Sequence, residues 1–148
     1  MCHVFCLEHK EKQFYTSIKY ETFIECDGVT DRSTKKVIEG AIEGKLMRVG
    51  QQRSFYSSFL GKNEFDDNDL ILFIDHFYPL GKIPDQNCLG KNFGITCLNL
   101  VQREILNFKA IIVTSVHANN KNMHQFLKTN SFNVIKKNGS IDYGKKLF

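Results

Sequence analysis

The sequence predicts a single α/β domain spanning residues 1–148, built around two buried strands that a helical connection joins. Two runs, 70–78 and 110–116, are apolar at nearly every position, which is typical of strands covered on both faces. Between them lie a glycine-containing loop and an apolar stripe at helical spacing. At 148 residues, with 42% hydrophobic and 24% charged residues, the chain has the length and composition of one globular domain.

The first half of the chain predicts three strands and one helix. Residues 13–25 are rich in Phe, Tyr, Thr and Ile, which favours a strand. Residues 31–44 begin with N-cap chemistry, carry apolar residues at helical spacing and end at a glycine, so we expect a helix there. Residues 45–51 and 54–60 are interpreted as two further strands.

The second half alternates strands and helices. After the strand over 70–78, the stripe over 93–105 predicts a helix, and the strand over 110–116 is followed by a helix over 119–131. Short strands over 132–135 and 141–147 complete the chain. A strand–helix–strand crossover is parallel and right-handed, which places the glycine loop at the carboxyl end of the 70–78 strand.

That glycine loop is the first candidate for chemistry. Gly90 and Gly94 open a helix directly after a buried strand. The amide groups of a first helical turn have no partner within the helix and bind anions, and glycines let the backbone approach a phosphate. The structural alternative is that both glycines only make a tight strand-to-helix turn.

Three segments resemble one known family. Residues 89–95 resemble the loop written Arg/Gln-x-x-Gly-x-Gly/Ala, with which acyl-CoA N-acetyltransferases of the GNAT superfamily wrap the coenzyme A pyrophosphate. Asn120 and Phe132 are separated by twelve residues, as in the family's second signature. Residues 73–78 are similar to the family strand that precedes the loop and pairs with the pantetheine arm.

The resemblance implies a mixed, mostly antiparallel sheet with a splayed parallel strand pair and flanking helices. It implies acetyl-CoA as cosubstrate and transfer of its acetyl group to an amine of a small molecule, peptide or protein. By resemblance, the residues that bind acetyl-CoA are Phe77, Leu89, Gly90, Lys91, Asn92, Phe93, Gly94, Ile95, Asn120 and Leu127.

The same resemblance places the catalytic residues on the strand beside the thioester. His76 and Asp75 are the candidates for the base that takes the proton of the amine, and alternation along a strand turns only one of them to the cleft. We favour His76, because imidazole is the side-chain group that changes charge near neutral pH. The alternative role of His76 and Asp75 is a hydrogen bond within the sheet. Tyr78 is a candidate for the acid that protonates the departing thiolate, and its alternative role is packing.

Departures from the family pattern keep a second function open. Leu89 stands where the family has Arg or Gln, Asn92 and Ser131 replace glycines, and Leu127 replaces a tyrosine found in many members. A GNAT-fold module that binds coenzyme A or a partner without catalysis is therefore the alternative.

Composition excludes several other classes. The net charge of +4 is spread along the chain, without the basic face that nucleic-acid binding needs. No apolar run approaches the roughly 20 residues of a membrane span, and the first residues lack the pattern of a secretory signal. Five cysteines without such a signal predict reduced thiols, so we expect a cytoplasmic protein. We expect a monomer or a homodimer, between which the sequence does not decide.

Four potential metal ligands lie near the N-terminus. Cys2, His3, Cys6 and His9 fall within eight positions, but their spacing matches no standard zinc site. We therefore expect no bound metal and interpret this segment as an ordinary reduced terminus.

Overall fold

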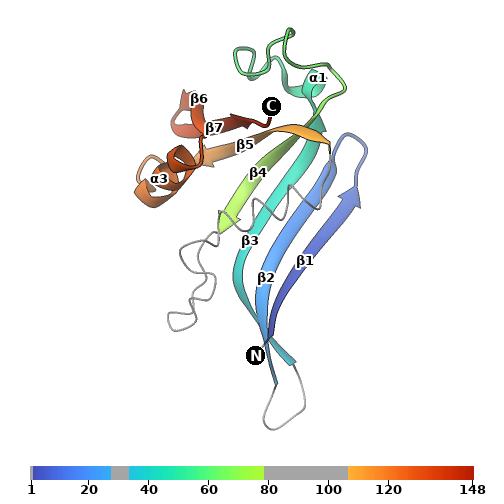
Figure 1. The fold of residues 1–148 in the computed structure, drawn as a ribbon, viewed down its shortest axis with the longest axis vertical. Helices are drawn as coiled ribbons and strands as arrows, with labels where there is room; N and C mark the ends of the chain where they lie inside the picture. Colours follow the sequence, from blue (N-terminus) through green and yellow to red (C-terminus); the bar gives the residue numbers. More distant parts are fainter. Residues whose placement is uncertain (1, 28–33, 79–106) are drawn as a thin grey trace.

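The computed structural model describes the backbone of residues 2–27, 34–78 and 107–148, and the side chains of 8–19, 42–76 and 107–148. Its main feature is one seven-stranded sheet (Figure 1). The strands are β1 (Cys2–Glu11), β2 (Thr16–Asp27), β3 (Thr34–Arg48), β4 (Leu70–Tyr78), β5 (Phe108–Val116), β6 (Asn133–Asn138) and β7 (Ser140–Lys146). The helices among the described residues are α1 (Val49–Gln52) and α3 (Lys121–Thr129).

The strands follow the order β1-β2-β3-β4-β5-β7-β6. Every neighbouring pair is antiparallel except β4 and β5, which are parallel. This confirms the mixed, mostly antiparallel sheet that the family resemblance implies. In Figure 1 the arrows of β4 and β5 start close together and point in clearly different directions.

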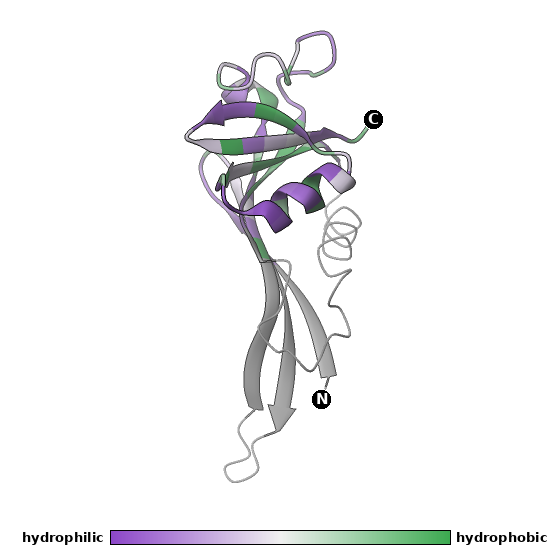
Figure 2. Cartoon of the chain, turned by 90° about the vertical axis from the view of Figure 1, so that its left-hand side faces the viewer, coloured by the Kyte–Doolittle hydropathy of each residue, from purple (hydrophilic) through white to green (hydrophobic). Residues whose placement is uncertain are grey.

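Both faces of the central strands are covered, which explains why these strands are apolar throughout. On one face Leu72 and Ile74 of β4 join a core cluster with Met123 and Leu127 of α3. On the other face Ile71 and Phe73 belong to a second cluster. This cluster also contains Val49, Leu60 and Phe65, which lie in the segment between β3 and β4. Figure 2 shows α3 lying along the sheet with its hydrophilic residues outward.

The helix expected over 31–44 is wrong: the described part of this range belongs to β3. Apolar residues in this segment fit helical spacing, but Gly40 and Gly44 weaken a helix and the β-branched residues favour an extended chain. Pairing with β2 on one side and β4 on the other then decides the conformation. Ile42 and Gly44 are both buried, as alternate residues on one face of a strand.

The two strands expected over 45–51 and 54–60 are also wrong beyond Arg48. Residues 49–52 form α1, and residues 53–69 form turns that the Arg53 guanidinium holds in place. Its Nε donates to the Leu60 carbonyl at 3.0 Å and its Nη2 to the Phe65 carbonyl at 2.7 Å, and it pairs with Asp67. These contacts to the backbone satisfy groups that a sheet would otherwise pair.

β1 was not predicted, whereas β2 and the described elements from β4 onwards agree with the prediction. The strand over 70–78 is β4, and the expected strand over 110–116 lies within β5. The helix expected over 119–131 contains α3, and the last two strands form the β6–β7 hairpin around Gly139, whose φ is +76°. The helix expected over 93–105 lies outside the described residues. No helix in the described part of the chain is long and apolar enough to span a membrane.

Candidate functional site

The candidate site lies where the parallel strands β4 and β5 separate. Their pairing runs from Leu70 and Phe108 to Ile74 and Val113 and ends there. Beyond it, the Thr114 hydroxyl donates to the Ile74 carbonyl at 3.4 Å, so a side chain takes the place of the next backbone donor. The edge of β4 past Ile74 that faces β5 therefore has no strand partner among the described residues.

A β-bulge in β4 marks the same level of the sheet. Glu43 of β3 pairs with His76 and Gly44 pairs with Ile74, which makes Asp75 the extra residue. The two strands approach so closely here that a Cβ on Gly44 would lie 2.0 Å from the Phe73 carbonyl oxygen. Only glycine fits this position, so the bulge that presents Asp75 depends on it.

α3 begins at Lys121, shortly after β5 ends at Val116. The Asn120 side chain caps the helix, accepting from the Met123 amide at 3.2 Å. Leu127 is fully buried in the core beneath α3. The structure thus assigns both residues a role in the fold, and their predicted contacts with acetyl-CoA stay predictions.

The predicted catalytic residues lie together at the end of β4. Asp75 and His76 are exposed on the segment that has left β5. Phe77 and Tyr78 are the last two residues of the strand, paired with Ile42 and Ala41 of β3. Residues 89–95, the predicted pyrophosphate loop, lie outside the described residues.

Two functional candidates, Tyr56 and Asp142, were not found from the sequence. The Tyr56 hydroxyl donates to Asp142 Oδ2 at 2.9 Å, and the Tyr56 ring packs on Phe73 of β4 with centroids 5.9 Å apart. Burial raises the pKa of Tyr56, and the hydrogen bond to Asp142 and the charges of Asp142 and Asp75 raise it further. The Tyr56 hydroxyl therefore stays a neutral hydrogen-bond donor, and it is close enough to Asp75 for that charge to affect its pKa.

A second polar cluster connects α3 to β7. His124 Nε2 lies 2.9 Å from the His117 carbonyl, which can only accept, so Nε2 carries the proton. In neutral His124, Nδ1 then accepts from the Tyr143 hydroxyl at 2.7 Å. Burial raises the pKa of Tyr143. These contacts satisfy a buried hydroxyl and fix α3 on the sheet.

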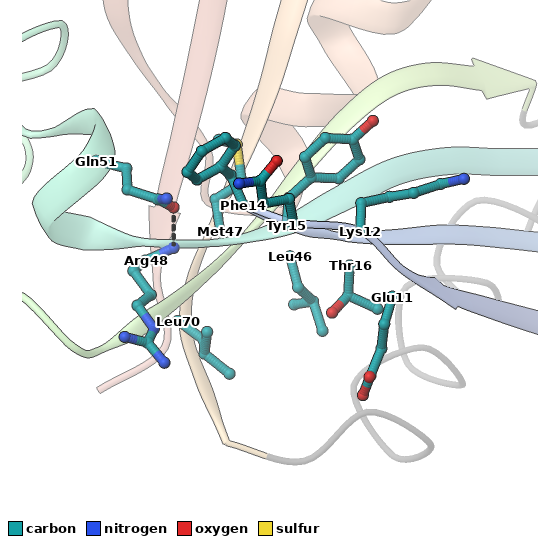
Figure 3. A pocket seen from close by; sticks show the side chains of 11 residues that line it. Glu11, Lys12, Phe14, Tyr15, Thr16, Leu46, Met47, Arg48, Gln51 and Leu70 are labelled. Atoms are coloured by element: carbon teal, nitrogen blue, oxygen red, sulfur yellow. Dashed lines mark hydrogen bonds between the residues drawn. The ribbon is translucent and has the colours of Figure 1, made fainter.

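Two surface hollows lie elsewhere on the described part of the molecule. One, of about 480 Å³, runs between α3 and the β6–β7 hairpin, with His124 and Tyr143 among its lining residues. The other, of about 430 Å³, lies where the β1–β2 turn meets the end of β3 and the first residue of β4. Figure 3 shows Phe14 and Tyr15 on one side of this hollow and Arg48 and Leu70 on another. It is at the opposite end of β4 from the separation.

Among the residues whose side chains the structure describes (8–19, 42–76 and 107–148), no three His, Cys, Asp or Glu side chains are grouped to hold an ion. The side chains of Cys2, His3 and Cys6 lie outside these ranges. The segment that carries Cys2, His3, Cys6 and His9 is the regular strand β1, paired along its whole length with β2. The expected ordinary terminus is thus a ten-residue strand of the sheet.

Comparison with known proteins gives similarity in structure only. No family model and no curated protein matches the sequence. Two crystal structures of Arabidopsis thaliana NAA60, a GNAT N-acetyltransferase, match over 88% of this chain. The complex with a bisubstrate analogue matches at 13% identity with a TM-score of 0.59 and is covered over 75% of its own length. The complex with acetyl-CoA matches at 12% identity with a TM-score of 0.61 and is covered over 76%. The likeness confirms the predicted GNAT fold.

Proposed function

We propose that this chain, which has the GNAT fold, is an acetyl-CoA-dependent N-acetyltransferase that acts on an amine of a small molecule, peptide or protein. The observation that supports the proposal most is the separation of β4 and β5 after Ile74 and Val113. A parallel pair that opens in the middle of a sheet leaves backbone donors and acceptors without strand partners, and these can pair with the amide groups of a bound ligand. The matched NAA60 structure with acetyl-CoA has the same fold.

The described residues fit the pantetheine arm of acetyl-CoA. The arm contains two amide groups, and the edge of β4 past Ile74, which pairs with no described residue of β5, offers backbone groups that can pair with amides. The predicted loop at 89–95 would bind the diphosphate through its backbone amides. Asn120 caps α3, which follows β5 in the chain, and His76 lies on β4 past the last residue that pairs with β5.

Acetyl-CoA supplies a thioester carbonyl, and the chain's own residues handle the protons. Nucleophilic attack needs a neutral amine, so a base must remove one proton as the C–N bond forms and the C–S bond breaks. Asp75 and His76 are the proposed bases, since the bulge places both at the exposed end of β4. Tyr78, two residues further on, is the proposed donor of the proton that the departing thiolate takes.

A non-catalytic coenzyme A-binding module is the second candidate, and Leu127 favours it. This position carries a tyrosine hydroxyl in many GNAT enzymes, whereas here it is a fully buried leucine without any proton to give. Binding without turnover is the result that this candidate predicts.

Thermal unfolding with acetyl-CoA tests the binding site. At a hundredfold excess over its dissociation constant, a ligand that binds only the folded state stabilises it by about 3 kcal/mol. For a chain of this size that raises the melting temperature by roughly 6–12 °C. Gly94→Leu should abolish the increase while Gly61→Leu, at a position with open space around it, should keep it. No increase with the wild type would exclude both candidates in their cofactor-binding form.

A thiol-release assay over a panel of amines then separates the two candidates. Continuous release of coenzyme A with some amine supports the enzyme, and binding without release supports the module. In the enzyme, His76→Gln and Asp75→Asn should keep acetyl-CoA stabilisation, and the variant that removes the base should lower kcat by about 10²-fold or more. Full activity in both variants would contradict the assignment of the base to β4.

A further inference from the structure

One carboxylate, that of Asp142, connects three segments at the level where β4 and β5 separate. Asp142 lies on β7, its Oδ1 accepts from the Ser115 amide of β5 at 2.7 Å, and its Oδ2 accepts from the Tyr56 hydroxyl at 2.9 Å. Tyr56 belongs to the turns between α1 and β4. Both carboxylate oxygens therefore accept a hydrogen bond within the protein, and the side chain connects these segments as a structural bridge.

The Ser115 end of the bridge is where β5 leaves its regular path. On β5, Val113 pairs with Tyr143 and Val116 pairs with Ile141, so Thr114 and Ser115 together stand opposite Asp142 alone. Ser115 has a φ of +58°, which a residue with a Cβ rarely adopts without compensation. The hydrogen bond from its amide to the Asp142 side-chain oxygen is that compensation, because a directional contact holds the amide in this conformation.

The Tyr56 end ties the bridge to β4. The Tyr56 ring packs on Phe73, whose neighbour Ile74 is the last β4 residue paired with β5. Lys136 lies opposite Asp142 in the β6–β7 hairpin, and its ammonium group is 5.3 Å from the Tyr56 ring centroid. Lys136 contacts the face of the Tyr56 ring and Asp142 accepts from its hydroxyl, so two contacts fix the position of this side chain.

We propose that Asp142 is a positioning residue that fixes the bulge at Thr114 and Ser115 and thereby holds β5 turned away from β4. Its significance for acetyl-CoA rests on the proposed function: the carboxylate sets the width of the opening that the pantetheine arm enters, and it contacts no reacting atom. Without the bridge, Ser115 returns to a regular extended conformation and the edge of β5 moves relative to β4.

The first experiment measures the bulge directly, without any ligand. Amide hydrogen exchange by NMR is compared for the wild type, Asp142→Ala, Asp142→Thr and Asp142→Asn. Threonine is included because it suits strands while its hydroxyl reaches less far, so the variant should fold even if the alanine variant does not. Asparagine can still accept from the Ser115 amide and donate to the Tyr56 oxygen. We expect protection of the Ser115 amide to fall about tenfold or more with alanine and threonine, and to stay within about threefold with asparagine.

Asp69→Ala is the matched control for this experiment. Its carboxylate also connects these two strands, because Asp69 precedes β4 and forms an ion pair at 3.2 Å with Lys109 of β5. This contact lies where the pairing of β4 and β5 begins, far from the separation. We expect Asp69→Ala to leave the protection of Ser115 unchanged relative to neighbouring amides. Unchanged Ser115 protection in Asp142→Thr, or an equal loss in Asp69→Ala, would overturn the proposal.

The second experiment connects the bulge to the ligand. We expect the dissociation constant for acetyl-CoA to rise about tenfold in Asp142→Thr and to return to within about threefold of the wild type in Asp142→Asn, with no change in Asp69→Ala. If asparagine binds as poorly as threonine, the charge and not the geometry matters and the proposal is wrong. If the wild type itself does not bind acetyl-CoA, the proposed function fails, and the exchange of Ser115 still decides the role of Asp142.

Discussion

Gly44→Ala is expected to be the most damaging small substitution in the described part of the sheet. A Cβ at this position would lie 2.0 Å from the Phe73 carbonyl oxygen, whereas real Cβ contacts under 3.0 Å are essentially never seen. The strands β3 and β4 must therefore move apart by about 1 Å. Because the clashing atom belongs to the backbone of a paired strand, no side chain can rotate away to relieve the contact.

The structure gives the size of the effect. A displacement of about 1 Å breaks one or two hydrogen bonds of the strand pair, each contributing about 1 kcal/mol net, and overpacking adds roughly 1–3 kcal/mol. We expect a loss of about 3 kcal/mol, a large part of the roughly 5–15 kcal/mol by which domains are stable. With a urea m value of about 2 kcal/mol/M, the unfolding midpoint should fall by about 1.5 M.

Urea unfolding followed by circular dichroism suits this chain, which has no tryptophan. Gly61→Ala is the control, because nothing lies within 4 Å of a Cβ there, and we expect it to be neutral or to stabilise by up to about 1 kcal/mol. A Gly44→Ala midpoint equal to that of Gly61→Ala would refute the close approach of β3 to β4, and with it the bulge at Asp75.

Three further substitutions test the surroundings of the site. Asn120→Ala should lower the free energy of unfolding by about 1 kcal/mol through loss of the cap on the Met123 amide, and Asn120→Ser should restore most of it; equal losses in both would show that the cap is not the cause. Leu127→Ala should cost about 2–5 kcal/mol in a urea titration because the side chain is fully buried, and a loss under 1 kcal/mol would contradict that burial. Burial alone would raise the pKa of Asp69, but hydrogen bonds from the Asp66 amide and Lys109 lower it from 3.8. A carboxylate whose pKa is lower in the folded than in the unfolded state stabilises the folded protein at pH values above its unfolded-state pKa. The decrease in the free energy of unfolding caused by Asp69→Asn should therefore be complete near neutral pH and should become smaller as the pH falls below about 4. A loss independent of pH would contradict this linkage.

The elements that were predicted correctly are those whose surroundings leave one choice. β4 and β5 are apolar on both faces because α3 covers one side and the segment between β3 and β4 covers the other. α3 begins at a residue that is both a good N-cap and followed by buried residues at helical spacing. β3 was missed because its apolar spacing fits a helix as well as a strand, and only its two neighbours in the sheet decide between them.

The candidate site was only partly accessible from the sequence. The crossover from β4 to β5 and the family resemblance predicted where a splayed pair would lie, and the pairing ends within that region. The bridge at Asp142 carries no local signal: its partners Ser115 and Tyr56 are 27 and 86 residues away in the chain. Such contacts arise from the register of strands and turns, which a single sequence does not reveal.

Mapping acetyl-CoA onto the chain by NMR chemical-shift changes tests the central claim most directly. If the ligand enters between the separated strands, the largest changes should fall on the amides of residues 74–78 and 113–120, with little change at Phe14, Tyr15 and Arg48 around the hollow at the other end of β4. Saturable binding that shifts the amides around that hollow and leaves residues 74–78 unchanged would contradict the account.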